Sequence, residues 1–203
     1  PIPEDLRVQL PLVRKVAESL NISMLECYGV EADDIIATVA HKANLEGKLA
    51  TIVSPDKDLT QLINHNINVY DPVKNKFVDA DEVFNKFGVQ PNQVRDYLAI
   101  VGDAADNIPG VSGVGPKGAA DLLNQFGGLS NIWDNLHNIA SAKRKENLVN
   151  SKEAALLSWE LVGLRQIDVD FELANFAWQA PEKDLILSFL NEFGFKSLVA
   201  RIE

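Results

Sequence analysis

The sequence predicts an α/β fold in its first part and an all-helical region in its second. Short apolar segments alternate with amphipathic helical patterns as far as residue 71, which implies right-handed crossovers and a parallel sheet. From Asp79 onward the strand patterns stop and helical spacing takes over. A glycine-rich passage over residues 110–118 interrupts the helical region. We therefore expect an α/β core over residues 1–92 and a helical lobe over residues 93–203.

The elements of the first part have recognisable start and stop signals. A proline and two acids precede the apolar-periodic run from Leu6 to Leu20, which predicts an amphipathic helix. Helical spacing returns over residues 31–46, and Gly47 ends it. The apolar pattern also predicts buried strands and one short helix: strands at residues 23–28, 49–53 and 67–70, and the helix at residues 59–63.

The second part contains helices only. Asp79 or Asp81 can cap a helix that continues to Phe87, where Gly88 ends it, and Pro91 opens the next helix. The remaining helices are expected from Ala119 and around residues 129–139, 143–163 and 182–192.

Composition excludes several classes of protein. With 203 residues and 46% hydrophobic residues the chain can bury a sizeable core, and no apolar run approaches the roughly 20 residues that span a bilayer. A single cysteine and three scattered histidines exclude an internal disulfide and a familiar zinc cage, which fits a reducing, cytoplasmic setting. A net charge of -10 argues against indiscriminate binding to phosphate backbones. The chain opens at Pro1 and has Met24 as its single methionine, so we expect it to be a piece of a longer protein.

Acidic residues gather in three groups, each where the chain leaves a strand or enters or leaves a helix. The groups are Glu31, Asp33 and Asp34; Asp56 and Asp58; Asp103 and Asp106. Ligand sites of open parallel sheets lie outside the carboxyl ends of the strands, so the groups are expected to converge there. Carboxylates that crowd together raise one another's pKa or require cations, and hard ions such as Mg²⁺ or Mn²⁺ prefer such oxygen ligands. Two such ions about 4 Å apart would make phosphodiester hydrolysis the natural reaction.

A structural role competes with this interpretation. Acids are common at helix N-termini, where they cap backbone amides and suit the helix dipole, and some of the 29 acids will cluster by chance. The repeated topological position of the three groups favours the metal site.

The passage from Pro109 to Ala120 has the pattern of a helix-hairpin-helix, an element that grips a phosphate backbone without reading base sequence. Its glycines, Gly113 and Gly115 among them, let backbone amides approach an anion ahead of a helix N-terminus, and Lys117 adds a positive charge there. An ordinary glycine turn between packed helices is the alternative.

Four segments resemble the 5′-nuclease domain of bacterial DNA polymerase I, which is related to flap endonucleases and phage 5′-exonucleases. They are EADDIIATVA, SPDKDLTQL, GDAADNIPGVSGVGPKGAADLL and NEFGFKSLVARIE, and the resemblance covers essentially the whole chain. It implies a PIN-like α/β nuclease core with a C-terminal helix-hairpin-helix lobe.

The resemblance also implies roles for particular residues. All seven acids of the three groups would hold two Mg²⁺ or Mn²⁺ ions, with Asp34, Asp56 and Asp103 as catalytic residues. Gly113, Gly115 and Lys117 would bind DNA, with K⁺ at the hairpin.

The implied activity is that of a 5′-3′ exonuclease and structure-specific 5′-flap endonuclease. The implied partners are DNA with a 5′ flap, nick or RNA primer end, and a C-terminal polymerase domain, in the nucleoid-containing cytoplasm of a bacterium. The family's domain begins with a strand that carries a further metal-site aspartate, followed by a basic arch, and no residues of this sequence match them. We therefore expect the missing N-terminal segment of the same domain as a further partner.

A catalytically incomplete DNA-binding fragment is the alternative function. The sequence also contains a basic stretch with two possible roles, formed by Lys143, Arg144, Lys145 and Lys152. It fits either contact with duplex DNA or a solvated helix face.

Overall fold

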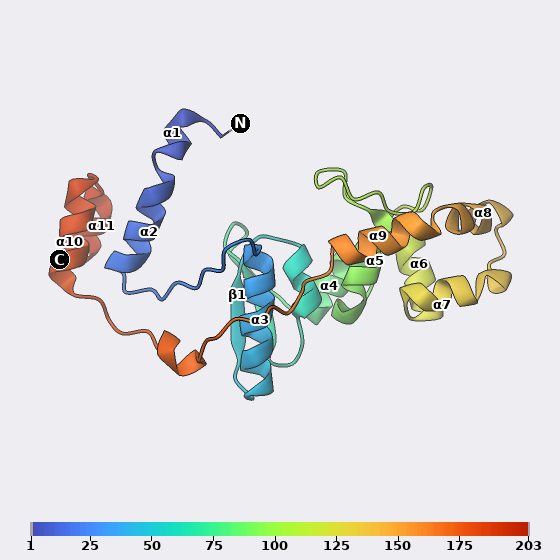
Figure 1. Ribbon diagram of the computed structural model, residues 1–203, viewed down its shortest axis with the longest axis horizontal. Coiled ribbons are helices and arrows are strands. Elements are labelled where there is room, and N and C mark those ends of the chain that lie inside the picture. The colour runs from blue at the N-terminus through green and yellow to red at the C-terminus, as the bar shows by residue number, and fades with distance from the viewer. Residues whose placement is uncertain (1, 203) are drawn as a thin grey trace. The chain divides into compact units, whose positions relative to one another are not determined.

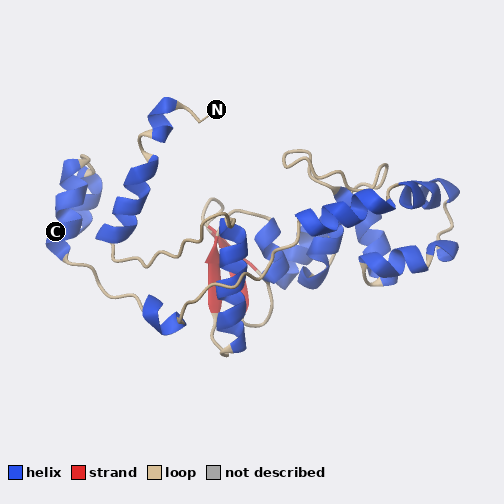
Figure 2. Cartoon of the chain, viewed as in Figure 1, coloured by secondary structure: helices blue, strands red, loops and turns tan. Residues whose placement is uncertain are grey.

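The computed structural model describes residues 2–202, which form two compact units (Figures 1 and 2). The terminal unit contains the residues up to Gly29 and those from Asp168 onward, and the central unit contains Val30–Ile167. The central unit holds all seven acids of the three groups and the glycine hairpin.

The sheet lies in the central unit, and in the described part of the chain it has three strands in the order β1-β2-β3: β1 (Ala50–Val53), β2 (Ile67–Asp71) and β3 (Lys76–Val78). β1 and β2 are parallel, with Ile52 opposite Val69, as the sequence predicts. β3 was not predicted, and it pairs antiparallel with β2 after the turn at residues 72–75. The sheet is therefore mixed rather than wholly parallel.

The predicted strand at residues 23–28 is wrong. In the described chain these residues pair with no other strand, and Met24 and Tyr28 are exposed. An extended segment becomes a strand only when a neighbour satisfies its backbone groups, and apolar composition alone does not supply that neighbour.

Helices surround the sheet and then form the rest of the central unit. They are α3 (Ala32–Leu45), α4 (Ala80–Phe87), α5 (Val94–Val101), α6 (Pro116–Phe126), α7 (Leu129–Asp134), α8 (Ala142–Asn150) and α9 (Lys152–Leu161), with 3-10 turns η1 (Asp58–Leu62), η2 (Pro91–Gln93) and η3 (Leu136–Asn138). The 59–63 prediction corresponds to η1.

One continuous apolar core connects the sheet with these helices. Val69 of β2, Leu98 of α5, Leu123 of α6 and Leu148 of α8 belong to the same cluster and are at most 4% exposed. Truncating such a side chain to alanine typically costs about 2–5 kcal/mol. The acid groups and the hairpin are thus held on one packed body.

The helix ends follow the sequence signals at most positions. Asp79 caps α4 by accepting a hydrogen bond from the Glu82 amide at 2.9 Å, and Gly88 ends it in the left-handed conformation with φ of 73°. The predicted helix 143–163 is wrong as a single element, because Ser151 separates α8 from α9. At that break the Ser151 hydroxyl accepts a hydrogen bond from the Ser112 amide of the hairpin.

The terminal unit is helical: α1 (Glu4–Arg7), α2 (Leu10–Ser19), α10 (Lys183–Glu192) and α11 (Lys196–Ile202), with the 3-10 turn η4 (Leu173–Phe176). The predicted helix from Leu6 to Leu20 is divided because Pro11 has no amide hydrogen to bond the preceding turn. The sequence pattern did not predict α11. α2 packs on α10, and Trp178 Nε1 donates to the Leu20 carbonyl at 3.2 Å. No helix within residues 2–202 combines the length and apolarity needed to cross a bilayer.

Candidate active site

The first acid group lies at the start of α3. Glu31 is the N-terminal cap residue of this helix, and Asp33 and Asp34 follow in its first turn. Asp34 is buried: its Oδ1 accepts a hydrogen bond from the Arg165 amide at 2.8 Å, and its Oδ2 lies 3.3 Å from Arg165 Nε. Nothing in the sequence pattern pointed to Arg165, because it lies 131 residues from Asp34. This contact fixes the position of the Asp34 carboxylate.

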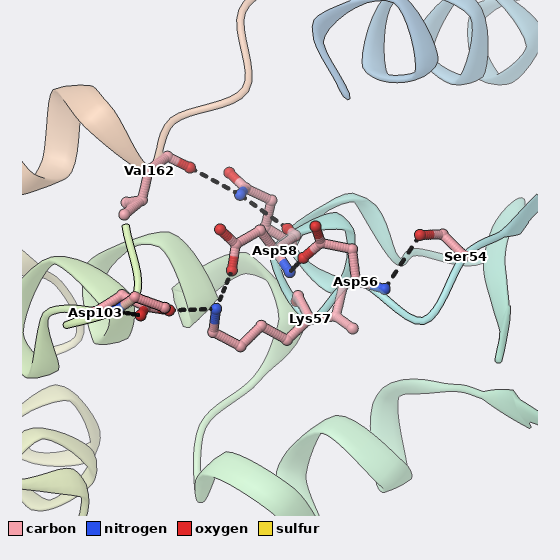
Figure 3. A network of polar contacts seen from close by, with 9 residues as sticks. Ser54, Asp56, Lys57, Asp58, Asp103 and Val162 are labelled. Atoms are coloured by element: carbon pink, nitrogen blue, oxygen red, sulfur yellow. Dashed lines mark hydrogen bonds and ion pairs between the residues drawn. The ribbon is translucent and has the colours of Figure 1, made fainter. Parts of the chain in front are cut away.

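The second acid group lies in the loop and turn that follow the carboxyl end of β1. Asp56 Oδ1 accepts a hydrogen bond from the Asp58 amide at 2.9 Å, and the Asp56 amide donates to Ser54 Oγ at 3.1 Å (Figure 3). Gln61 bonds both the Asp58 carbonyl and the Val162 carbonyl, at 2.9 and 3.0 Å. These contacts fix the loop and hold it against the end of α9.

The third acid group follows α5. The Asp103 backbone pairs with Ile108, and Asp103 Oδ1 accepts a hydrogen bond from the Ala105 amide at 2.8 Å. Asp106 lies in the turn between them and is exposed.

Lys57 connects the second and third groups. Its Nζ donates to Asp103 Oδ2 at 2.6 Å and lies 3.2 Å from Asp58 Oδ1 (Figure 3). Sequence reasoning missed this lysine, although its position between two aspartates was a visible signal.

The pKa shifts reflect this arrangement. Burial, followed by repulsion from Asp56, Asp58 and neighbouring acids, raises the pKa of Asp33. Burial also raises the pKa of Asp58, although Lys57 opposes the shift. The hydrogen bond from Lys57 lowers the pKa of Asp103. Burial alone would lower the pKa of Lys57, but its bonds to Asp103 and Asp58 outweigh burial and raise it.

The structure brings some of the predicted residues together and leaves others apart. Acids from two groups repel the Asp33 carboxylate. A cavity of about 460 Å³ is lined by four of the acids and two arginines: Glu31, Asp33, Asp34, Asp58, Arg95 and Arg165. Asp103 joins these acids through Lys57, whereas within residues 2–202 the Asp106 side chain forms no hydrogen bond or ion pair with them. Within residues 2–202 no three acid, histidine or cysteine side chains lie close enough to hold one metal ion.

The donor chemistry nevertheless fits a hard divalent ion. All the side chains concerned offer carboxylate oxygen, and the buried Asp58 Oδ1 has the Lys57 ammonium 3.2 Å away as an ion-pair partner but no well-aligned hydrogen bond within the described residues. A cation satisfies such an oxygen and relieves the repulsion that contributes to the raised pKa of Asp33.

The glycine hairpin lies between α5 and α6. Gly110 and Gly113 have φ of 64° and 73°, and a Cβ on Gly110 would lie 2.6 Å from the Gly102 amide nitrogen, so only glycine fits there. Gly115 is the N-terminal cap residue of α6, and Lys117 is exposed in its first turn. Amides of a first helical turn have no acceptor within the helix and can bind an anion.

Two serines hold the hairpin in place. Ser158 of α9 is fully buried and accepts a hydrogen bond from the Gly110 amide at 3.0 Å, while Ser151 accepts from the Ser112 amide at 3.3 Å. The fold and the two sites together are typical of one class of protein, the nucleases that combine an acid-bearing α/β core with a phosphate-binding helical hairpin.

Comparison with known proteins identifies the family. The family model described as the 5′-3′ exonuclease N-terminal resolvase-like domain matches residues 1–88, and that of the 5′-3′ exonuclease C-terminal SAM fold matches residues 89–184. The chain is 37% identical over 206 residues to a 5′-3′ exonuclease of Aquifex aeolicus, with 99% of this chain and 68% of that protein covered. The chain belongs to the 5′-3′ exonuclease family.

Longer proteins and solved structures are also similar. DNA polymerase I of Rhizobium leguminosarum is 38% identical over 201 residues, which cover 98% of this chain and 20% of the polymerase. The chain thus spans about one fifth of that relative. A bacteriophage T5 flap endonuclease, solved as a pseudo-enzyme-product complex with DNA and metal ions, aligns with a TM-score of 0.63 and 26% identity over 69% of this chain and 52% of that one. These similarities confirm the resemblance and the predicted nuclease fold.

Proposed function

We propose that the chain is the 5′-nuclease part of a DNA replication and repair enzyme. It would hydrolyse phosphodiester bonds in DNA at 5′ flaps, nicks and RNA primer ends, with residues 1–92 as nuclease core and residues 93–203 as DNA-binding lobe. A polymerase domain, as in the polymerase I relatives, and a preceding segment of the same domain are its proposed partners in the bacterial cytoplasm, near the nucleoid.

The observation that carries the proposal is that acids from two separate groups lie close enough to repel one another. Burial is the largest cause of the raised pKa of Asp33, and repulsion from Asp56 and Asp58, which follow β1, adds to it. The family to which the chain belongs is a family of nucleases. Glu31, Asp33, Asp34, Asp56, Asp58, Asp103 and Asp106 would hold two Mg²⁺ or Mn²⁺ ions. Such ions, when bound, supply an activated water and neutralise charge on the leaving oxygen.

The chain's own residues position the substrate. The hairpin amides near Gly113 and Gly115, the Lys117 ammonium and K⁺ would bind the phosphate backbone of the duplex. Because Ser158 and Ser151 fix this hairpin on the core that carries the acids, backbone binding orients the scissile phosphate toward Asp34, Asp56 and Asp103.

Cleavage of a labelled 5′-flap duplex tests the proposal. We expect product with Mg²⁺ or Mn²⁺, none with EDTA, and a loss of at least about 100-fold in Asp103→Ala with duplex binding retained. Asp81→Ala removes an exposed aspartate of α4 and should cleave normally. Equal loss of cleavage and binding in Asp103→Ala would contradict the metal-site assignment.

A second function, the catalytically incomplete DNA-binding fragment, is favoured by one observation. No three candidate ligands lie together within residues 2–202. If the flap duplex is bound but stays intact with either metal, the chain grips DNA and its active site requires residues from a preceding segment.

A further inference from the structure

Helix α8 (Ala142–Asn150) lies directly against the glycine hairpin of the same unit (Figure 1). A Cβ placed on Gly113 would lie 2.5 Å from Asn147 Nδ2, and one placed on Gly118 would lie 3.9 Å from Arg144 Nη2. The Arg144 guanidinium therefore lies near the first turn of α6, at the residue that follows Lys117. One face of α8 therefore borders the surface that the hairpin presents to a phosphate backbone.

The charge here differs in sign from that of the chain. Residues 110–118 and 141–152 contain five cationic side chains and a single acid, Glu146, whereas the whole sequence carries a net charge of -10. The cations are Lys117, Lys143, Arg144, Lys145 and Lys152. A local excess of positive charge in an acidic protein favours contact of that region with a polyanion.

Two neighbouring cations of α8, Lys143 and Arg144, differ in whether their charge is paired with an acid. Lys143 forms an ion pair with Glu146 at 3.2 Å, so its charge is already neutralised locally. Arg144 and Asn147 are three residues apart on the face toward the hairpin. In the described part of the chain Arg144, which is half-buried, has no ion pair and no hydrogen bond from its guanidinium. A guanidinium placed in this way keeps all its donors for a ligand.

We propose that Arg144 is a second phosphate-binding side chain, which extends the hairpin surface along the backbone of double-stranded nucleic acid. The inference rests on the proposed DNA binding by the hairpin and adds to it a residue from a different helix. Lys117 contacts the backbone as a point charge, and Arg144 can donate two parallel hydrogen bonds to a phosphate. Neither contact depends on base sequence.

Fluorescence anisotropy with a labelled blunt duplex of mixed sequence, in EDTA, tests this role without any cleavage. The wild-type chain, Arg144→Gln and the matched control Lys143→Gln are titrated over a series of salt concentrations. We expect Arg144→Gln to weaken binding about 3- to 10-fold at low salt and to reduce the slope of log K against log salt by about one. Lys143→Gln should change both quantities less than Arg144→Gln does, because the Lys143 charge is already paired with Glu146.

Two further measurements keep the test decisive. Thermal unfolding checks that Arg144→Gln is folded, and Arg144→Lys, which retains the charge, should recover most of the salt slope. Arg144→Gln binding with the wild-type affinity and slope would overturn this inference while the hairpin assignment stands. Failure of the wild-type chain to bind any duplex would overturn the proposed DNA binding and the role of Arg144 with it.

Discussion

Lys57 is the residue that joins two of the acid groups. Its ammonium lies 2.6 Å from an Asp103 oxygen and 3.2 Å from an Asp58 oxygen, and all three side chains are largely shielded from solvent. The sequence shows Lys57 between Asp56 and Asp58, but nothing in the sequence indicates an ion pair with Asp103, which lies 46 residues away. Spacing predicts which side chains share a helix face, whereas contacts between distant segments depend on the packed fold.

Lys57→Met should lower the stability of the metal-free protein. The substitution keeps the apolar stem of the side chain but leaves two partly buried carboxylates without their cation. We expect a loss of about 1 kcal/mol, discounted for the partial exposure of the pair, and a fall of about 2–4 °C in Tm. Urea and thermal unfolding in EDTA at pH 7 measure it, and Lys143→Met, from an exposed ion pair, is the control.

The same variant has a defined pH dependence. The pKa of Asp103 is lowered in the folded state, so its ion pair contributes stability above the unfolded pKa of about 3.9, and this contribution is lost as the pH falls through the folded pKa. The difference between wild type and Lys57→Met should therefore be constant from pH 7 to 5 and shrink at lower pH. A difference that grows on acidification would show that the lysine does not act through Asp103.

At the scale of elements, the hairpin depends on α9. Ser158 of α9 accepts a hydrogen bond from the Gly110 amide and donates one to the Ala154 carbonyl at 2.8 Å. The glycines make the backbone conformation of the hairpin possible. The buried hydrogen bond to Ser158 of α9 stabilises that conformation over others.

Ser158→Ala should therefore weaken DNA binding from a distance. The Gly110 amide would be left buried without an acceptor, which costs about 1–3 kcal/mol. We expect lower duplex affinity with an unchanged salt slope, because the same phosphates are contacted by a less well-positioned hairpin. Anisotropy titrations and thermal unfolding measure both effects, with the exposed Ser130→Ala as control. A changed salt slope would instead indicate that phosphate contacts are lost.

Elements with local signals were predictable, and elements that depend on distant partners were not. The ends of α3 and α4 follow from Gly47, Asp79 and Gly88, and β1 and β2 follow from apolar runs bounded by turns. The strand predicted at residues 23–28 failed because apolar composition does not provide a pairing neighbour. β3 was missed because a short strand with an exposed Phe77 carries little pattern of its own.

At the scale of the whole molecule, two acids of the candidate site, Asp33 and Asp58, oppose folding when they are ionised. The types of the site's acids and their arrangement in three groups were readable from the sequence, and motif resemblance predicted the family. The sequence could not show that Asp34 is tied to Arg165 or that Asp106 stays exposed, since both depend on how distant segments meet. The pKa values of Asp33 and Asp58 are raised, first by burial, so both carboxylates are less favourable when ionised in the folded chain.

Asp33→Asn should therefore stabilise the metal-free protein at pH 7. The folded pKa of Asp33 lies above its unfolded value, so ionisation opposes folding, and the advantage of asparagine should vanish as the pH falls through that raised pKa. We expect Tm to rise by about 1–3 °C in EDTA. Millimolar Mn²⁺ should raise the Tm of the wild type more than NaCl of equal ionic strength and should reduce or reverse the advantage of the variant, since bound cations stabilise the folded acids. The exposed Asp81→Asn serves as the control, and a lower Tm for Asp33→Asn in EDTA, or equal effects of Mn²⁺ and NaCl, would contradict a cation-binding role for these acids.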